Sequence, residues 1–560
     1  MQQRTAKDAI VEQLCADGIR YVFGNPGTVE QGLLDSIERH PDLDYVLALH
    51  ETAAVGMADG YARATRRPTV VQLHTGVGLG NGIGMLYQAK RGHSPLVVLA
   101  GEAGLRYDAM DSQMAADLVG MARPVTKWAT RVVDPSSVLR VLRRAIKVAS
   151  TAPAGPVFVS LPMDVLDALT TEPAAPTTVV DTRVAPTDQA VRTAAQRLLA
   201  GHEPLIIAGD GVAASGAHDE LGRLAEVLGA QVWGADWSEV NLDPGHPLYS
   251  GQLGHMFGEQ SREVIQRADA VLICGTYLFP EVFPLLESVF GEDTQVVHID
   301  LDTWEIAKNF PVAQAIAADP KLTLGLLADA VEQLRGPGQQ AEAQERVRRS
   351  VEDKQRAQDA AARADADVRD LLPLRASRFA TELAELVPED AIFFDESLTS
   401  SPEIFRYLTP ARPGQLFQTR GGSLGVGMPG TIGVQLANPG RTVIGLVGDG
   451  GSLYTAESLW SAARYRVPAK FVICNNGSYE LLRLNIEQYW REREVPHHEF
   501  PASFDLSEPA IDFVGLAASF GVSGERVATA EEIRPAIERA LAHPGPYLID
   551  LVIADHTTTR

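Results

Sequence analysis

Two short polar motifs in the last third of the chain combine residues that could hold a metal ion and a diphosphate. Gly448-Asp449-Gly450 follows the apolar run 444–447, and Asn475-Asn476-Gly477-Ser478 ends the next apolar run, 471–474. If these runs are neighbouring parallel strands, both motifs lie at the carboxyl edge of the sheet, where ligands bind. Carboxylate, amide and carbonyl oxygens suit Mg²⁺, and glycines let a backbone approach phosphate at a helix N-terminus. The sequence therefore predicts a Mg²⁺-diphosphate site here.

The elements that must position these motifs follow an α/β pattern along the chain. Apolar runs of strand length alternate with segments of helix length, which is typical of parallel sheets covered by helices on both faces. Gly209-Asp210-Gly211 is expected to be an ordinary turn, because no Asn-Asn motif follows it. We predict three doubly wound parallel-sheet domains at 1–173, 188–335 and 372–560, with a charged helical linker at 336–371.

Composition and charge exclude several classes of protein. A chain of 560 residues corresponds to about three or four domains, and a net charge of −23 gives no electrostatic reason to bind nucleic acid or an anionic membrane. No signal peptide is visible, and no apolar run approaches the roughly 18 residues of a membrane span. The scattered Cys15, Cys274 and Cys474 predict neither disulfides nor a usual zinc site. We expect a cytoplasmic protein that binds neither nucleic acid nor membranes.

The two motifs, and nearly the whole chain, resemble thiamine-diphosphate (ThDP) enzymes. The similar branch of that family contains benzoylformate decarboxylase, pyruvate decarboxylase and acetolactate synthase. Stretches that resemble benzoylformate decarboxylase are Val22-Phe23-Gly24-Asn25-Pro26-Gly27, Leu47-Ala48-Leu49-His50-Glu51, Ala58-Asp59-Gly60-Tyr61-Ala62 and His93-Ser94-Pro95-Leu96. The resemblance implies that the three domains are pyrimidine-binding, middle and diphosphate-binding, in that order.

The resemblance also implies how the cofactor is held. Asp449 and Asn476 would ligate Mg²⁺ through their side chains and Ser478 through its carbonyl, while Leu424 would wedge between the two cofactor rings. Leu398 replaces a hydroxyl residue that contacts phosphate in the family. The remaining residues expected to contact the cofactor are Asn25, Pro26, Gly27, Thr399, Gly422, Gly448, Gly450, Gly451 and Tyr479.

Three residues match catalytic positions of the family. Glu51 matches the glutamate that protonates the aminopyrimidine ring, so that the thiazolium carbon can lose its proton and become a nucleophile. His74 matches an active-site histidine of benzoylformate decarboxylase, a residue type that transfers protons near neutral pH. Thr28 stands where that family has a serine that handles the substrate carboxylate.

Other positions depart from the patterns of individual family members. Val282 replaces the second catalytic histidine of benzoylformate decarboxylase, and Leu482, which with Leu481 would shape the substrate pocket, replaces a catalytic glutamate of pyruvate decarboxylase. Met114 stands where acetolactate synthases carry a glutamine, and Gln113 lies one residue away. No flavin-binding motif is found, so FAD is not expected.

The charged and aromatic segment 485–501 leaves a further alternative open. In 2-hydroxyacyl-CoA lyases a glutamate near this position serves as an acid or base, and Glu494 or Glu492 is a candidate for that role. A solvated surface helix is the other interpretation of this segment.

The sequence thus favours a ThDP- and Mg²⁺-dependent enzyme that cleaves a C–C bond, a non-oxidative 2-oxo acid decarboxylase similar to benzoylformate decarboxylase. The alternatives are a carboligase of the acetolactate synthase type, a 2-hydroxyacyl-CoA lyase and a ThDP-binding subunit without turnover. The substrate would be a small 2-oxo acid or a related carbonyl compound. The resemblance implies a homodimer or homotetramer with active sites between subunits, where Glu51 comes from one subunit and the Mg²⁺-diphosphate site from the other.

Overall fold

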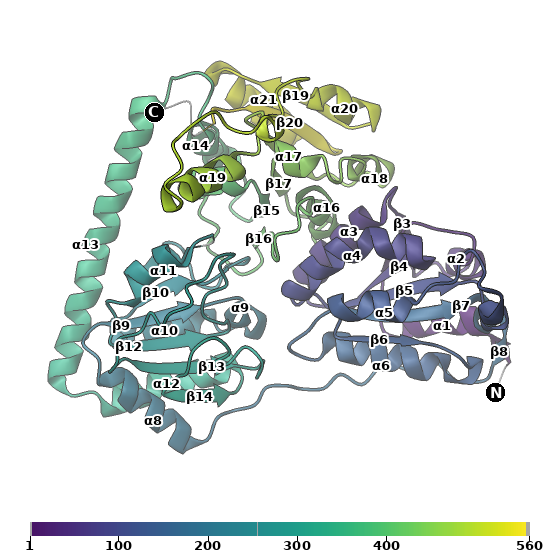
Figure 1. The fold of residues 1–560 in the computed structure, drawn as a ribbon, viewed down its shortest axis with the longest axis horizontal. Coiled ribbons are helices and arrows are strands. Elements are labelled where there is room, and N and C mark those ends of the chain that lie inside the picture. The colour runs from purple at the N-terminus through teal and green to yellow at the C-terminus, as the bar shows by residue number, and fades with distance from the viewer. Residues whose placement is uncertain (1–2, 255, 556–560) are drawn as a thin grey trace. The chain divides into compact units, whose positions relative to one another are not determined.

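The computed structural model describes residues 3–254 and 256–555 (Figure 1). Two compact units can be distinguished by their internal contacts. One combines the chain up to Val180 with Arg369–Leu408 and the chain from Gln418 onward, and the other combines Asp181–Val368 with Thr409–Phe417. Three six-stranded sheets are present among the described residues, which confirms the predicted fold of three doubly wound α/β domains.

The N-terminal sheet has the strand order β3-β2-β4-β5-β7-β6, and its strands pair in parallel. Its central strands β4, β5 and β7 are buried along nearly their full length because helices cover both of their faces. The elements of this domain are β1 (Arg4–Thr5), α1 (Ala6–Ala16), β2 (Tyr21–Gly24), α2 (Gln31–Glu38), β3 (Asp44–Leu47), α3 (Glu51–Thr65), β4 (Thr69–His74), α4 (Thr75–Arg91), β5 (Leu96–Glu102), α5 (Leu118–Ala122), β6 (Trp128–Arg131), α6 (Val138–Ser150), β7 (Val157–Pro162), α7 (Met163–Asp167) and β8 (Leu169–Thr170), with 3-10 turns at Leu105–Met110, Arg123–Val125 and Pro135–Ser137.

The middle sheet has the order β11-β10-β9-β12-β13-β14, again with parallel pairing. A 32-residue helix, α13, follows it and buries only Ala343 and Ser350, so most of its surface is solvated. The elements are α8 (Asp188–Leu199), β9 (Pro204–Ala208), α9 (Gly211–Ser215), α10 (His218–Leu228), β10 (Gln231–Gly234), β11 (Tyr249–Gln252), α11 (Gly258–Ile265), β12 (Ala270–Cys274), β13 (Gln295–Asp300), β14 (Gln314–Ala317), α12 (Pro320–Leu334) and α13 (Pro337–Val368).

The C-terminal sheet has the order β16-β15-β17-β18-β20-β19. Strands β15, β17, β18, β20 and β19 pair in parallel. The elements are α14 (Ala376–Leu386), β15 (Ile392–Glu396), η4 (Leu398–Ser400), α15 (Ser401–Ile404), β16 (Leu416–Gln418), α16 (Gly427–Ala437), β17 (Val443–Gly448), α17 (Asp449–Ser452), α18 (Ser458–Arg464), β18 (Lys470–Asn475), α19 (Glu480–Glu492), η5 (Ala502–Phe504), α20 (Phe513–Ser519), β19 (Ser523–Val527), α21 (Ala530–Ala542) and β20 (Tyr547–Val552). None of the described helices is both long and apolar enough to span a bilayer.

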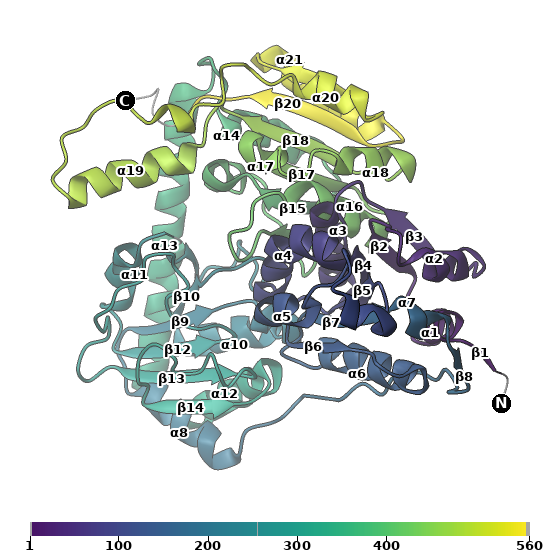
Figure 2. The ribbon, with the colours of Figure 1, turned by 45° about the vertical axis from the view of Figure 1, so that its right-hand side comes forward.

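Helices α3 and α16 join the N-terminal and C-terminal domains within one compact unit (Figure 2). Glycines lie where the two backbones meet. A Cβ atom added at Gly60 would lie 2.2 Å from the carbonyl oxygen of Gly430, and one added at Gly433 would lie 2.0 Å from that of Met57. Glycine is therefore required at these positions by the close approach of the two helices.

Replacing Gly433 by alanine is expected to push the two helices apart, because the added carbon meets backbone rather than a movable side chain. Overpacking of this kind destabilises a protein by typically ~1–3 kcal/mol. Chemical denaturation should show a lower midpoint for G433A, whereas G440A, where a Cβ has no neighbour within 4 Å, should resemble the wild type. Equal midpoints for the two variants would contradict this account of the helix contact.

Candidate active site

The two predicted metal-binding motifs meet at the carboxyl edge of the C-terminal sheet. Strands β17 and β18 are parallel neighbours, so the turns that follow them are adjacent. The Asp449 carboxylate is buried and accepts the backbone N–H of Gly450 at 2.8 Å and that of Gly477 at 2.7 Å. The amide oxygen of Asn476 accepts the N–H of Ser478 at 3.0 Å. One carboxylate and one amide oxygen are thereby fixed on adjacent turns.

The electrostatics of this corner favour a cation. Burial raises the pKa of Asp449 to about 6, although N–H groups of the two turns act in the opposite direction. A bound cation would remove the cost of keeping this carboxylate charged. The described residues contain no cluster of three or more His, Cys, Asp or Glu side chains that could bind a metal ion. The donor set of Asp449, Asn476 and the Ser478 carbonyl fits Mg²⁺, which accepts few protein ligands and keeps its waters.

The predicted diphosphate contacts surround the same corner. A Cβ added at Gly450 would lie 2.4 Å from the ring of Tyr479, so that the ring lies directly against the glycine backbone. Thr399 lies on the 3-10 turn η4 that follows β15, and Leu398 at its start has a φ of +49°. Because a positive φ is strained for leucine, the turn is held in an unusual conformation next to the predicted phosphate site.

The glycine-rich segment 421–425 is held by a carboxylate that sequence reasoning missed. Glu396, the last residue of β15, is fully buried and accepts the backbone N–H of Gly425 and of Gly427, each at 2.6 Å. Gly422 and Gly425 have φ values of +73° and +94°, so the segment forms a turn that glycine alone adopts without strain. The half-buried Leu424 lies between these two glycines, at the position predicted to contact the cofactor.

At the edge of the N-terminal sheet, Glu51 begins α3 and is buried. The side-chain amide of Asn81 on α4 donates a hydrogen bond to its carboxylate at 3.0 Å. A Cβ added at Gly78 would lie 2.8 Å from the Glu51 carboxylate, so the absence of a side chain there makes room for this group. Asn81 was not identified from the sequence, although a polar residue among the glycines of α4 could have indicated a functional position.

His74 ends β4 at the same edge and forms a second hydrogen-bonded pair. Its Nδ1 atom lies 2.9 Å from the carboxylate of Glu30, a buried residue that sequence reasoning also missed. The Asn25-Pro26-Gly27 turn covers this ring, since a Cβ at Gly27 would lie 1.9 Å from Nδ1. Thr28, which follows the turn, is exposed. No hydrogen bond or ion pair among the described residues links Glu51 or His74 to the side chain of Asp449, Asn476 or Ser478.

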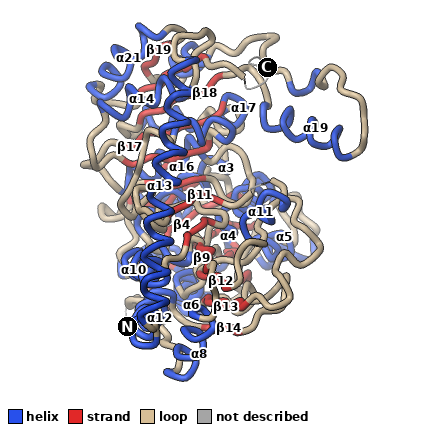
Figure 3. Tube along the Cα trace, turned by 90° about the vertical axis from the view of Figure 1, so that its left-hand side faces the viewer, coloured by secondary structure: helices blue, strands red, loops and turns tan. Residues whose placement is uncertain are grey.

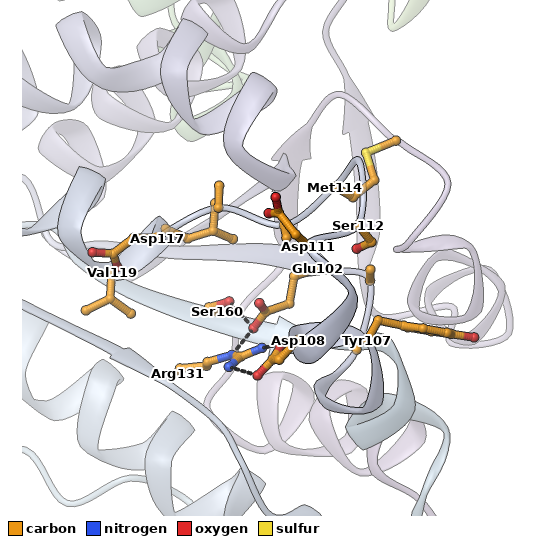
Figure 4. Close-up of a pocket in the computed structure, with 15 residues that line it drawn as sticks. Glu102, Tyr107, Asp108, Asp111, Ser112, Met114, Asp117, Val119, Arg131 and Ser160 are labelled. Carbon is orange, nitrogen blue, oxygen red and sulfur yellow. Dashed lines mark hydrogen bonds and ion pairs between the residues drawn. The ribbon is translucent and has the colours of Figure 1, made fainter.

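A cavity of about 390 Å³ lies in the N-terminal domain beyond β5 (Figure 4). Met114 is part of its lining, whereas the neighbouring Gln113 is exposed and does not line it. On one wall Arg131 pairs with Glu102 at 2.6 Å and with Asp108 at 2.8 Å. Of the two alternative positions in this segment, Met114 therefore lines the pocket and Gln113 does not.

The other predicted pocket residues lie on or after α19, which Figure 3 shows extending away from the C-terminal sheet. Leu481 is half-buried and Leu482 is 43% exposed, so neither is fully covered by its own chain. Glu494 is exposed just after the helix end. The helix is secured by Trp490, which is buried against His497, His498 and Phe500.

The buried Glu396 makes stability depend on pH. Burial raises its pKa from 4.5 to about 7, so between these values the folded chain holds a proton that the unfolded chain has lost. Stability should fall as pH rises through this window, by about 3 kcal/mol. Thermal unfolding of wild type and E396Q between pH 4.5 and 7.5 checks this, because the advantage of the wild type should shrink as pH rises. The exposed Glu531 supplies the control, since E531Q should follow the wild type at every pH.

Comparison with known families agrees with the order of the domains. Residues 4–121 match the N-terminal TPP (thiamine pyrophosphate) binding domain of thiamine pyrophosphate enzymes, 191–327 their central domain and 399–551 their C-terminal TPP binding domain. The matched ranges contain most of the site residues described above, including Glu51 and His74 in the first and Asp449, Asn476 and Tyr479 in the last.

Individual relatives align over nearly the full length. Benzoylformate decarboxylase of Pseudomonas aeruginosa is 32% identical, with 98% of each chain covered. Acetolactate synthase 1 of Zea mays is 27% identical over 98% of this chain and 85% of its own. Among solved structures, a ThDP-dependent 4-hydroxybenzoylformate decarboxylase from Rhodococcus jostii superposes with a TM-score of 0.85 at 30% identity, covering 98% of this chain and 99% of that one. The chain therefore belongs to the family of thiamine pyrophosphate enzymes, and it carries that family's N-terminal, central and C-terminal domains in order.

Proposed function

We propose that this thiamine pyrophosphate enzyme is a Mg²⁺-dependent, non-oxidative decarboxylase of 2-oxo acids. The observation that carries the proposal is the pair of supported proton-transfer groups at the N-terminal sheet edge, Glu51 bonded to Asn81 and His74 bonded to Glu30. A subunit that only bound the cofactor would need neither pair. Full-length similarity to a benzoylformate and a 4-hydroxybenzoylformate decarboxylase supports the same reaction class.

When bound, ThDP supplies a carbon nucleophile that adds to a substrate carbonyl and takes up the electrons released with CO₂. Asp449, Asn476 and the Ser478 carbonyl would hold the Mg²⁺ that anchors the diphosphate. Gly450, Gly451 and Thr399 would donate to the diphosphate oxygens, since backbone N–H groups and a hydroxyl suit that task. Glu396 keeps the segment that carries Leu424 in place through its two backbone hydrogen bonds.

The remaining residues would act on protons and on the substrate. Glu51 would hold the proton that the aminopyrimidine ring exchanges, with its carboxyl group oriented by Asn81. His74 would take and return a proton at the substrate, and the Thr28 hydroxyl would donate a hydrogen bond to the substrate carboxylate. Leu481, Leu482 and Met114 would line the part of the pocket that receives the acyl substituent and would exclude water from it.

We also propose that the enzyme works as a homodimer or homotetramer with active sites between subunits. Large apolar side chains are exposed close in sequence to the predicted site residues on both sheet edges. Leu49 is 44% exposed two residues before Glu51, and Val77 is 68% exposed three residues after His74. Tyr454 is 54% exposed shortly after the Gly448-Asp449-Gly450 turn. A second copy of the chain would cover this surface, so that Glu51 of one subunit would lie next to the Mg²⁺-diphosphate site of the other.

A carboligase or a 2-hydroxyacyl-CoA lyase is the second candidate, because Val282 occupies the place of a second histidine. Valine cannot donate a proton, and it is 56% exposed. In a carboligase the acyl carbon that has lost CO₂ would join a second carbonyl compound rather than a proton. A product assay separates the two candidates.

The role of Mg²⁺ can be tested with a matched pair of variants. D449N removes the charge from the metal site, and D210N makes the same change in a Gly-Asp-Gly turn whose aspartate bonds to Ser238 and Asn241. Titration calorimetry with ThDP and Mg²⁺ should show at least about tenfold weaker binding for D449N, which corresponds to ~1.4 kcal/mol, and unchanged binding for D210N. EDTA should abolish binding in the wild type. Equal affinities of the two variants would exclude Asp449 as the metal ligand.

The reaction can be identified by mass spectrometry of products. Purified protein with ThDP and Mg²⁺ is supplied with pyruvate, branched 2-oxo acids or benzoylformate, each with and without an acceptor aldehyde or formyl-CoA. We expect aldehyde and CO₂ without an acceptor, and E51Q should lower kcat by at least about 100-fold because a positioned acid or base contributes 10²–10⁴-fold. E38Q, at the exposed end of α2, should retain activity. Product that appears only with an acceptor would establish the second candidate instead.

A further inference from the structure

Glu30 connects three separate elements at the edge of the N-terminal sheet. It is the residue before α2, and its side chain is 1% exposed. One carboxylate oxygen, Oε2, lies 2.9 Å from Nδ1 of His74 at the end of β4. The other, Oε1, accepts the backbone N–H of Gly101 on β5 at 2.9 Å. Both oxygens of this buried group are therefore committed to fixed partners.

These contacts determine which nitrogen of His74 carries hydrogen. An ionised carboxylate can only accept hydrogen bonds, so the imidazole must donate from Nδ1, and a neutral ring then has its lone pair on Nε2. Burial raises the pKa of Glu30, whereas the bonds from His74 and from Gly101 favour its ionised form. The Tyr45 hydroxyl, which also faces this carboxylate, is directed to the side chain of Gln72.

The surroundings also fix the position of the ring. The backbone of Gly27 covers the Nδ1 side, since a Cβ there would lie within 1.9–2.4 Å of Nδ1, Cγ and Cε1. The His74 side chain nevertheless remains 18% exposed. Because Glu30 and Gly27 enclose Nδ1, Nε2 is the ring nitrogen left to meet a further partner.

We propose that Glu30 is a positioning residue that holds His74 as the Nδ1–H tautomer and so leaves Nε2 as the atom that takes up and gives back a proton. During this exchange Nδ1 keeps its hydrogen and Glu30 stays ionised, which stabilises the imidazolium formed when Nε2 is protonated. The assignment of the tautomer rests on the geometry alone. Its catalytic consequence rests on the proposed function, in which His74 acts on the substrate.

Substituting glutamine for Glu30 provides a sharp test, because Gly101 fixes the orientation of the new amide. The Gly101 N–H requires the amide carbonyl, so the NH₂ group must face Nδ1 of His74 and donate to it. His74 would then have to accept at Nδ1 and carry its hydrogen at Nε2. In ¹⁵N-histidine NMR spectra, the Nδ1 and Nε2 signals of His74, assigned with an H74Q variant, should exchange their protonated and unprotonated shifts in E30Q.

The same variant should lower kcat by at least about 100-fold while KM changes by less than about 3-fold, because Nε2 would no longer be free to accept a proton. D59N is the matched control. Asp59 is another buried carboxyl group of this domain, but it bonds to Ser94 and not to His74. The control should keep both the Nδ1–H tautomer and the activity of the wild type.

The outcomes separate this inference from the proposed function. A wild-type spectrum with hydrogen on Nε2 of His74 would overturn the proposal even if E30Q does not fold, as would an unchanged tautomer in E30Q. An exchanged tautomer with unchanged kcat would overturn the role of Nε2. If the wild type decarboxylates none of the 2-oxo acids, the proposed function fails, and the NMR spectra still decide the tautomer.

Discussion

Carboxylate groups buried at the ends of parallel strands are the constraint on which this site depends. A charged group removed from water is costly unless hydrogen bonds or a counter-ion compensate for it. Backbone N–H groups of the glycine-rich turns offset part of this cost for Asp449 and Glu396, although burial still raises the pKa of both. The same bonds that make burial tolerable therefore fix the conformation of the turns that would contact the cofactor.

The N-terminal domain also contains buried, hydrogen-bonded carboxylates, but there their partners include side chains. Glu30 accepts a glycine N–H with one oxygen and leaves the other for an imidazole, while Glu51 receives a side-chain amide. Glycines again provide the space, at Gly27 against His74 and at Gly78 against Glu51. One sheet edge thus holds backbone turns suited to an anion and a cation, and the other holds side chains suited to moving protons. This division agrees with the expectation that the C-terminal domain binds the diphosphate and the N-terminal domain binds the pyrimidine ring.

Some features of the fold and of the candidate site could be predicted from the sequence, whereas others could not. The fold, and the adjacency of the Asp449 and Asn476 motifs, could be predicted because apolar strands end in recognisable turns. The similar turn at 209–211 could be set apart from the metal-binding motif because no Asn-Asn motif follows it. Glu30, Asn81 and Glu396 could not be found in the same way. A single glutamate or asparagine carries no pattern, and each gains its meaning from a contact 29 to 71 positions away in the chain. The choice between Gln113 and Met114 was ambiguous because a loop has no periodic pattern that fixes its alignment with related sequences.

The substitution at Val282 changes what the remaining histidine must do under the proposed function. Where two histidines are present, one can donate a proton while the other accepts one. Here a single imidazole must both protonate and deprotonate, so its two nitrogens cannot be interchangeable. A ring that is free to rotate or to change tautomer would present Nε2 in the wrong protonation state part of the time. An immobile carboxylate on Nδ1 would remove that ambiguity, and we assign this part to Glu30, which Gly101 holds in place. Under the proposed function, the buried carboxylate would thus allow one histidine to serve both directions of proton transfer.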